Sequence, residues 1–151
     1  MKLGVDTSFL VRATMAGCDG HAESYAFLHR EFVSGHHQLA IATPVLAELI
    51  HMVTDSRRFS NPMTLPQAIA AAGYWWSAAE TVRVYPSAAG SELFLDWMLR
   101  FKLGRKRLLD TQLAAIYVAS DVHWIVTTDA EHFRIFPDFH PIIPGKGKPP
   151  S

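Results

Sequence analysis

The sequence predicts a single α/β domain with a central, mostly parallel sheet and helices on both of its faces. Short apolar runs typical of strands alternate along the chain with longer segments in which apolar residues recur at helical spacing. Strands that alternate with helices favour a parallel sheet covered on both sides. The chain has 151 residues, 49% of them hydrophobic and 19% charged, which suits one globular domain with a sizeable core.

The elements follow from this periodicity in chain order. The predicted strands are Lys2 to Val5, Gln38 to Ala42, Thr81 to Tyr85, Trp124 to Thr127 and His140 to Ile143. The predicted helices are about Ser8 to Met15, His21 to Ser34, Pro44 to Thr54, Leu65 to Ala79, Ser91 to Lys102 and Leu109 to Ser120. Thr43 is expected to cap the third helix, with Pro44 at its first position. The domain should span residues 1–143, and the Pro/Gly/Lys-rich residues 144–151 should form a flexible basic tail.

Composition excludes several classes of function. No apolar stretch reaches the ~18 residues of a transmembrane helix, and the N-terminus lacks a signal-peptide pattern, so we expect a cytoplasmic protein without a membrane partner. The single cysteine, Cys18, permits neither an internal disulfide nor a cysteine-based zinc site. Basic and acidic residues number 14 each, so any binding of nucleic acid must be local.

Two aspartates stand just after predicted strands, at the sheet edge where open α/β proteins bind ligands. Asp6 follows the first strand in VDTSF, and Asp129 follows the fourth in TTDAEHF. Each also has a purely structural interpretation. Asp6 can cap the helix that begins near Ser8, and Thr128 with Glu131 can form a capping box beside Asp129.

Two further acids lie on helices. Asp110 falls on the same helical stripe as the apolar Leu113 and Tyr117, where an ionised carboxylate is costly unless a positive group meets it. Its structural alternative is a place in the first turn, where the helix dipole favours an anion. Glu48 borders the apolar stripe of TPVLAELIHMV, and a border glutamate is most often simply solvated.

The four acids say more together than singly. In a doubly wound sheet of order 3-2-1-4-5 the first and fourth strands are neighbours, so Asp6 and Asp129 meet where the order reverses, and helices can aim Glu48 and Asp110 into the same crevice. Crowded carboxylates require a proton or a cation between them, and oxygen ligands suit Mg²⁺ or Mn²⁺. A hard ion there can activate water against a phosphodiester.

A basic run precedes Asp110 in RFKLGRKR. Its cations, Arg105, Lys106 and Arg107 among them, are either a solvated helix end or a surface that holds a nucleic-acid backbone near the acids.

These motifs, in this order and spacing, resemble the PIN-domain nucleases, and among them the VapC-type toxin ribonucleases of VapBC toxin–antitoxin modules. The resemblance covers nearly the whole chain: Asp6-Thr7-Ser8, Ala47-Glu48-Leu49, the segment Leu109 to Ala115, and Thr127-Thr128-Asp129 followed by Phe133. It implies a PIN-like three-layer α/β/α sandwich and a Mg²⁺- or Mn²⁺-dependent endoribonuclease that cleaves cellular RNA. It also implies a VapB-type antitoxin partner and a homodimer.

Carried over by position, the resemblance assigns catalytic roles to Asp6, Glu48, Asp110 and Asp129. Asp6 and Asp110 are the expected metal ligands. Ser8 and Thr127 are expected to support them by hydrogen bonds.

Two other classes of function stay open at the level of sequence. A small-molecule phosphatase also places acids at strand ends, but the aspartyl phosphatases need a second aspartate two residues after the first, where this chain has Ser8. A non-catalytic interaction domain is favoured if Trp75 and Trp76 form an exposed aromatic anchor rather than part of the core. The scattered histidines, His132 among them, are not expected to enter the site because they lack the i, i+4 spacing of a zinc site.

Overall fold

The computed structural model describes residues 1–150, and its centre is one parallel sheet. Its strands are β1 (Lys2–Val5), β2 (Gln38–Ala42), β3 (Thr81–Val84), β4 (Trp124–Val126) and β5 (His140–Ile142). They lie in the order β3-β2-β1-β4-β5, and every neighbouring pair is parallel. The predicted fold class and strand order are therefore confirmed, and the order reverses between β1 and β4.

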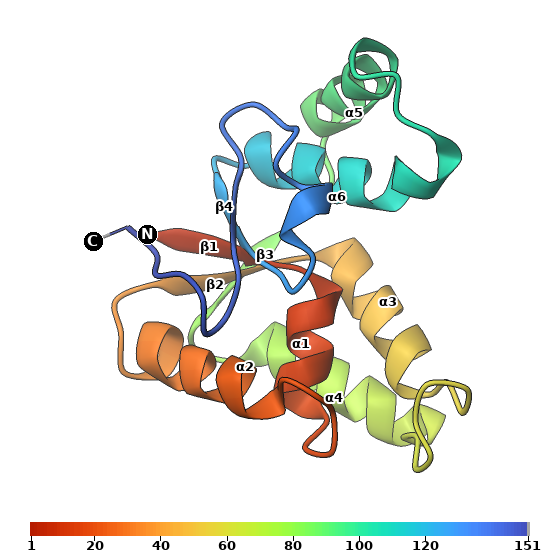
Figure 1. Cartoon of the computed structure of the whole chain (residues 1–151), viewed down its shortest axis with the longest axis vertical. Coiled ribbons are helices and arrows are strands. Elements are labelled where there is room, and N and C mark those ends of the chain that lie inside the picture. The colour runs from red at the N-terminus through yellow and green to blue at the C-terminus, as the bar shows by residue number, and fades with distance from the viewer. Residues whose placement is uncertain (151) are drawn as a thin grey trace.

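Helices cover both faces of this sheet, as Figure 1 shows. The helices are α1 (Thr7–Thr14), α2 (His21–Leu28), α3 (Thr43–Val53), α4 (Leu65–Ser77), α5 (Ala88–Arg100) and α6 (Leu108–Val118). In Figure 1, α5 and α6 lie above the sheet and α1 to α4 lie below it, which makes the three predicted layers. The consecutive side chains of Leu39, Ala40 and Ile41 on β2 point alternately to the two faces and are all buried, as a strand covered on both faces requires.

Most helix ends lie within two residues of the sequence prediction, and three differ from it in length or in the capping residue. The predicted helix from His21 to Ser34 is α-helical only to Leu28, and His29–Val33 form a π-helical turn (η1). Phe27 and Phe32, five residues apart, both pack on Phe9, with ring centroids 6.0 and 6.4 Å from it. A wider turn lets two residues at this spacing face the same core.

The other two differences concern capping residues. Helix α3 has Ala42 at its N-cap position, so the prediction that Thr43 caps it is wrong; Pro44 still lies in the first turn, where a missing N–H costs no hydrogen bond. Helix α5 begins three residues earlier than predicted, because the Ser87 hydroxyl accepts a hydrogen bond from the Gly90 amide at 3.1 Å.

Tyr117 joins the strands that carry the proposed site. Its buried hydroxyl accepts from the amides of Val5 and Ala42, both at 3.2 Å, and lies 2.7 Å from the Val5 carbonyl and 3.0 Å from the Ala40 carbonyl. The β1–β2 ladder has its last pair at Gly4 and Ala40, so the hydroxyl serves backbone groups where the two strands part. A Cβ on Gly4 would lie 3.0 Å from the Tyr117 ring, which explains glycine there.

The chain's C-terminal residues and its helices bear on two further expectations. Pro144 is buried, and the amides of Lys146 and Gly147 bond to the Ile143 carbonyl, which makes a turn directly after the sheet. Ser151, the last residue of the predicted flexible tail, lies outside the described residues, and the flexibility of residues 144–151 stays a prediction. Within residues 1–150, no helix combines the length and the apolar composition needed to cross a bilayer.

Candidate active site

Asp6 stands at the point where the strand order reverses. Its amide donates to the Val126 carbonyl at the end of β4, at 3.0 Å. It occupies the N-cap position of α1, yet its side chain makes no capping hydrogen bond. Instead, Oδ2 of Asp6 accepts from the hydroxyls of Ser8 at 2.7 Å and Thr127 at 2.8 Å. The capping interpretation of Asp6 therefore does not describe its side chain, which belongs to a polar network across the switch point.

The network extends from Asp6 into the loop after β4. Ser8 Oγ accepts from the Thr128 amide at 3.1 Å, and Thr127 Oγ1 accepts from the Asp129 amide at 3.0 Å. Thr127 itself is fully buried. These bonds fix the carboxyl ends of β1 and β4 to each other. The position of Asp6 is therefore set by two segments that meet at Ser8 and Thr127, 119 residues apart in sequence.

Glu48 approaches Asp6 from α3. The buried Thr7 hydroxyl, one residue after Asp6, donates to Glu48 Oε2 at 3.0 Å. Glu48 is only half-buried, and it lines a cavity of about 330 Å³ between α3 and α6. The expectation that a border glutamate is merely solvated therefore fails for this side chain. Thr7 was not foreseen, because nothing in the sequence links it to a residue 41 positions away.

The electrostatics place Asp6, Glu48 and Asp110 within one another's field. Burial raises the pKa of Asp6 above its ordinary value; the hydroxyls of Ser8 and Thr127 oppose the rise, and the charge of Asp110 adds to it. Burial also raises the pKa of Glu48, and the charges of Asp6 and Asp110 raise it further. A proton or a cation is therefore favoured at this edge of the sheet.

Asp110 lies in the first turn of α6, beside a histidine and an arginine. His132 Nδ1 is 2.7 Å from its Oδ2, and Arg107 Nε is 4.0 Å from the same oxygen. Leu113 and Tyr117 on its helical stripe are buried, as the sequence pattern predicted. The expectation that no histidine enters the site is thus wrong for His132. The sequence feature that could have identified His132 is its position three residues after Asp129, in the short turn that follows this acid.

Asp129 is the most exposed of the four acids, with 54% of its side chain accessible. It precedes a short 3₁₀ turn, η3 (Ala130–His132), and makes no side-chain cap there, so the predicted capping box is not formed. Its Oδ2 lies 3.4 Å from His132 Nδ1. His132 therefore stands between Asp129 and Asp110 and connects the fourth acid to the others.

The three predicted RNA-binding cations do not have the same surroundings. Arg105 and Lys106, in the 3₁₀ turn η2 (Arg105–Arg107) before α6, are exposed. Arg107 is turned inward: its Nη2 donates to the His132 carbonyl, and its Nε is buried without a hydrogen-bond partner among residues 1–150. Arg107 thus differs from the surface cation expected from sequence, because its guanidinium is taken up by the site.

The donor set suits a hard metal ion in its chemistry. Burial and repulsion by neighbouring carboxylates raise the pKa of Asp6 and Glu48. Their carboxylate oxygens are ligands that Mg²⁺ and Mn²⁺ prefer. In the part of the chain that the structure describes, no three His, Cys, Asp or Glu side chains stand close enough to hold an ion without adjustment. An ion would therefore have to draw carboxylates together from α3, α6 and the end of β1.

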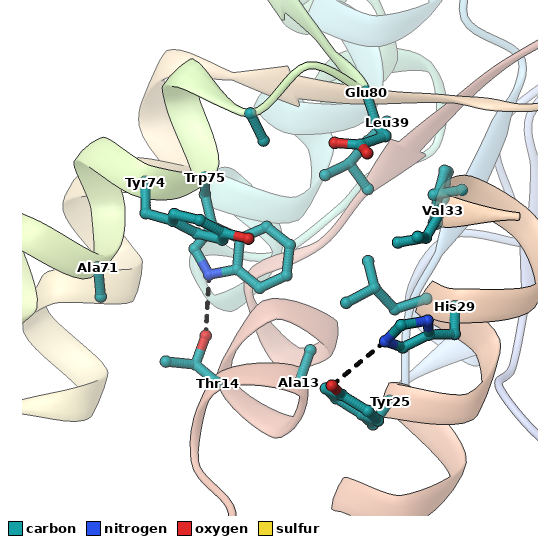
Figure 2. Close-up of a pocket in the computed structure, with 13 residues that line it drawn as sticks. Ala13, Thr14, Tyr25, His29, Val33, Leu39, Ala71, Tyr74, Trp75 and Glu80 are labelled. Atoms are coloured by element: carbon teal, nitrogen blue, oxygen red, sulfur yellow. Dashed lines mark hydrogen bonds between the residues drawn. The ribbon is translucent and has the colours of Figure 1, made fainter.

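An apolar cavity of about 430 Å³ lies between α1, α2 and α4, and none of the four acids lines it (Figure 2). Trp75 forms one wall; it is 6% exposed, and its indole N–H donates to the Thr14 hydroxyl at 2.9 Å. Trp76 is partly buried, packs against the core, and has the Arg83 guanidinium 5.4 Å from its ring. The tryptophan pair is thus mainly core, which removes the observation that favoured an exposed aromatic anchor.

Comparisons with known proteins agree with this fold. No protein-family sequence model matches the chain, and no curated protein matches it in sequence. Among solved structures, it is similar to VapC20 of Mycobacterium tuberculosis, a toxin that cleaves the sarcin–ricin loop, with a TM-score of 0.68 and 18% identity over 92% of this chain and 99% of that one.

Two toxin–antitoxin structures are similar as well. VapBC2 of Rickettsia felis, solved with a fragment of its promoter DNA, has a TM-score of 0.65 and 18% identity over 95% of this chain and 98% of that one. A toxin–antitoxin complex from Klebsiella pneumoniae has a TM-score of 0.59 and 15% identity over 94% and 97%. At these identities the comparisons establish the fold, and the PIN-like sandwich predicted from the sequence is confirmed.

Proposed function

We propose that this chain is a Mg²⁺- or Mn²⁺-dependent endoribonuclease and the toxin of a toxin–antitoxin pair. The observation that carries the proposal is that Asp6, Glu48 and Asp110, from three different elements, face the reversal of strand order, where burial and then the charge of Asp110 raise the pKa of Asp6 and Glu48. Carboxylates in this state are poised for a hard cation, and ligands bind at this position in open α/β sheets.

The residues have distinct roles in this proposal. Asp6 and Asp110 would hold the ion, and Glu48 and Asp129 would complete its surroundings. When bound, Mg²⁺ or Mn²⁺ supplies an activated water and neutralises the charge that develops on a phosphodiester. Ser8 and Thr127 keep one oxygen of Asp6 oriented. The exposed Arg105 and Lys106 bind the RNA backbone beside α6 without reading its sequence.

The proposed partner and substrate rest on the solved structures of similar fold. One similar structure is a toxin that cleaves the sarcin–ricin loop, and another is a toxin–antitoxin complex. These support an RNA substrate and a VapB-type antitoxin for this chain. A homodimer, which the resemblance implies, and a cytoplasmic location, which the composition predicts, are part of the same proposal.

The experiment is an RNA-cleavage assay with purified wild-type protein, Asp6→Asn and Asp110→Asn, in Mn²⁺ and in EDTA. Both variants should lose more than the ~10–100-fold that removal of an outer-shell partner costs, because each lacks a proposed ligand. Asp96→Asn is the matched control, since Asp96 is exposed on α5 and pairs with Arg100 at 2.7 Å, outside the site.

This assay, repeated with small phosphate esters and joined to Mn²⁺ calorimetry, separates the other two classes of function. Cleavage of RNA in Mn²⁺ by the wild type, lost in EDTA and in both site variants but kept in Asp96→Asn, supports the nuclease. Turnover of small phosphate esters in place of RNA would favour a phosphatase. Undiminished cleavage by Asp6→Asn contradicts the site, and failure of the wild type to bind Mn²⁺ in calorimetry favours a non-catalytic interaction domain.

A further inference from the structure

Each of the three central acids has one carboxylate oxygen held by a neighbouring side chain. Asp6 Oδ2 accepts from two hydroxyls, and Glu48 Oε2 accepts from Thr7. Asp110 Oδ2 has His132 Nδ1 at 2.7 Å. These side-chain contacts involve Oδ2 of Asp6 and Asp110 and Oε2 of Glu48.

His132 is the least expected of these side chains, and its backbone is fixed. It closes the 3₁₀ turn η3, which starts directly after Asp129. Arg107 Nη2 donates to its carbonyl, and the carbonyl of Arg107 in turn accepts from Thr111 Oγ1 at 2.6 Å. Arg107 immediately precedes α6, the helix that carries Asp110, so one arginine ties the turn with His132 to the start of that helix.

The chemistry of the contact assigns the proton. Asp110 Oδ2 and Asp129 Oδ2, at 2.7 and 3.4 Å from His132 Nδ1, are carboxylate oxygens, which only accept hydrogen bonds when ionised. A bare Nδ1 would set its lone pair against both oxygens, so these short approaches favour a hydrogen on Nδ1. His132 then orients Asp110 in the way that a hydrogen-bond donor outside the coordination shell orients a metal-binding carboxylate.

We propose that His132 is a positioning residue for Asp110: its Nδ1–H holds Oδ2 of the carboxylate and leaves the other oxygen directed to a divalent cation, while Arg107 holds His132 in place through its carbonyl. This inference rests on the proposed function, because it concerns the same metal site. Beyond the four acids, the site then includes His132 Nδ1 beside Asp110 and the contact between Arg107 and the His132 carbonyl.

The test compares replacements that keep or lose a donor at the Nδ1 position. The amide nitrogen of asparagine is as many bonds from Cα as His Nδ1, whereas that of glutamine is one bond further. Mn²⁺ binding is measured by calorimetry on the wild type, His132→Asn, His132→Gln and His132→Ala. We expect His132→Ala and His132→Gln to bind Mn²⁺ ~10-fold more weakly and His132→Asn to stay within about 3-fold of the wild type.

Two further measurements make the result specific. His36→Asn is the control, since His36 is exposed just before the N-terminal end of β2, at the opposite edge of the sheet from Asp6. Thermal unfolding of each variant checks that the fold is kept. In the ion-free wild type, nitrogen-15 NMR should find His132 with its hydrogen on Nδ1, a readout that needs no metal and no activity.

The outcomes separate this inference from the proposed function. Wild-type Mn²⁺ affinity in His132→Ala, equal weakening in His132→Asn and His132→Gln, or an Nδ1 without hydrogen would each overturn the positioning role while leaving the nuclease proposal intact. Failure of the wild type itself to bind Mn²⁺ would refute the metal site and, with it, the role assigned to His132.

Discussion

Tyr117→Phe removes a single hydroxyl from the middle of the fold and tests how the site is supported. The hydroxyl is fully buried, and burial raises its pKa, so it stays protonated and acts as both donor and acceptor. Phenylalanine keeps the ring that packs under Gly4 but leaves the amides of Val5 and Ala42 without their acceptor. These amides lie beside the residues that begin α1 and α3.

The magnitude follows from the two orphaned amides. A buried donor left unsatisfied costs about 1–3 kcal/mol, so the free energy of unfolding should fall by about 2–6 kcal/mol. That is a large share of a domain stability of about 5–15 kcal/mol, and it corresponds to a loss of at least ~4 °C in melting temperature for a chain of this size.

Urea unfolding followed by circular dichroism measures this difference. Tyr74→Phe is the matched control: Tyr74 is 70% exposed, and its variant should unfold within ~0.5 kcal/mol of the wild type. The urea midpoint of Tyr117→Phe should shift with little change in slope. A loss below ~1 kcal/mol would refute the view that this hydroxyl satisfies the strand ends where β1 and β2 part.

Three other predictions concern the site and one helix end. Because burial raises the pKa of Asp6 and Glu48, these carboxyls stay protonated in the folded protein at a pH where the unfolded chain has released their protons. In EDTA, the urea midpoint should therefore fall as the pH rises from ~4 through the raised pKa values of the folded protein. Asp6→Asn should make this fall smaller. In an Asp6→Asn background, Arg105→Gln and Lys106→Gln should each lower the salt dependence of RNA binding by ~0.7 in log–log slope, whereas unchanged slopes would exclude phosphate contacts. Thr64→Ala should destabilise by ~1 kcal/mol in thermal unfolding, because Thr64 and Gln67 form a capping box at the start of α4.

The sequence alone predicted the strands to within one residue and most helix ends to within two. The predicted ends of β3, β4 and β5 exceed the observed ones by one residue each. These elements can be predicted because the alternation of apolar and polar residues, the helical spacing of apolar residues and the turn residues are local properties of the chain. The π-helical turn after Leu28 could not be predicted from the sequence, because it depends on the packing of Phe27 and Phe32 on the ring of Phe9 in another helix.

For the site, the sequence determined which acids stand at strand ends or on an apolar helix face, and the strand order that brings Asp6 and Asp129 to one edge. Three contacts appear only in the folded chain: Thr7 holds Glu48, Arg107 turns inward, and His132 lies against Asp110, which is 22 residues earlier in the chain. The physical reason is that an acid's place in a pattern depends on its own neighbours in sequence. The donor that meets it is set by how separate helices and turns pack, which no short stretch of sequence encodes.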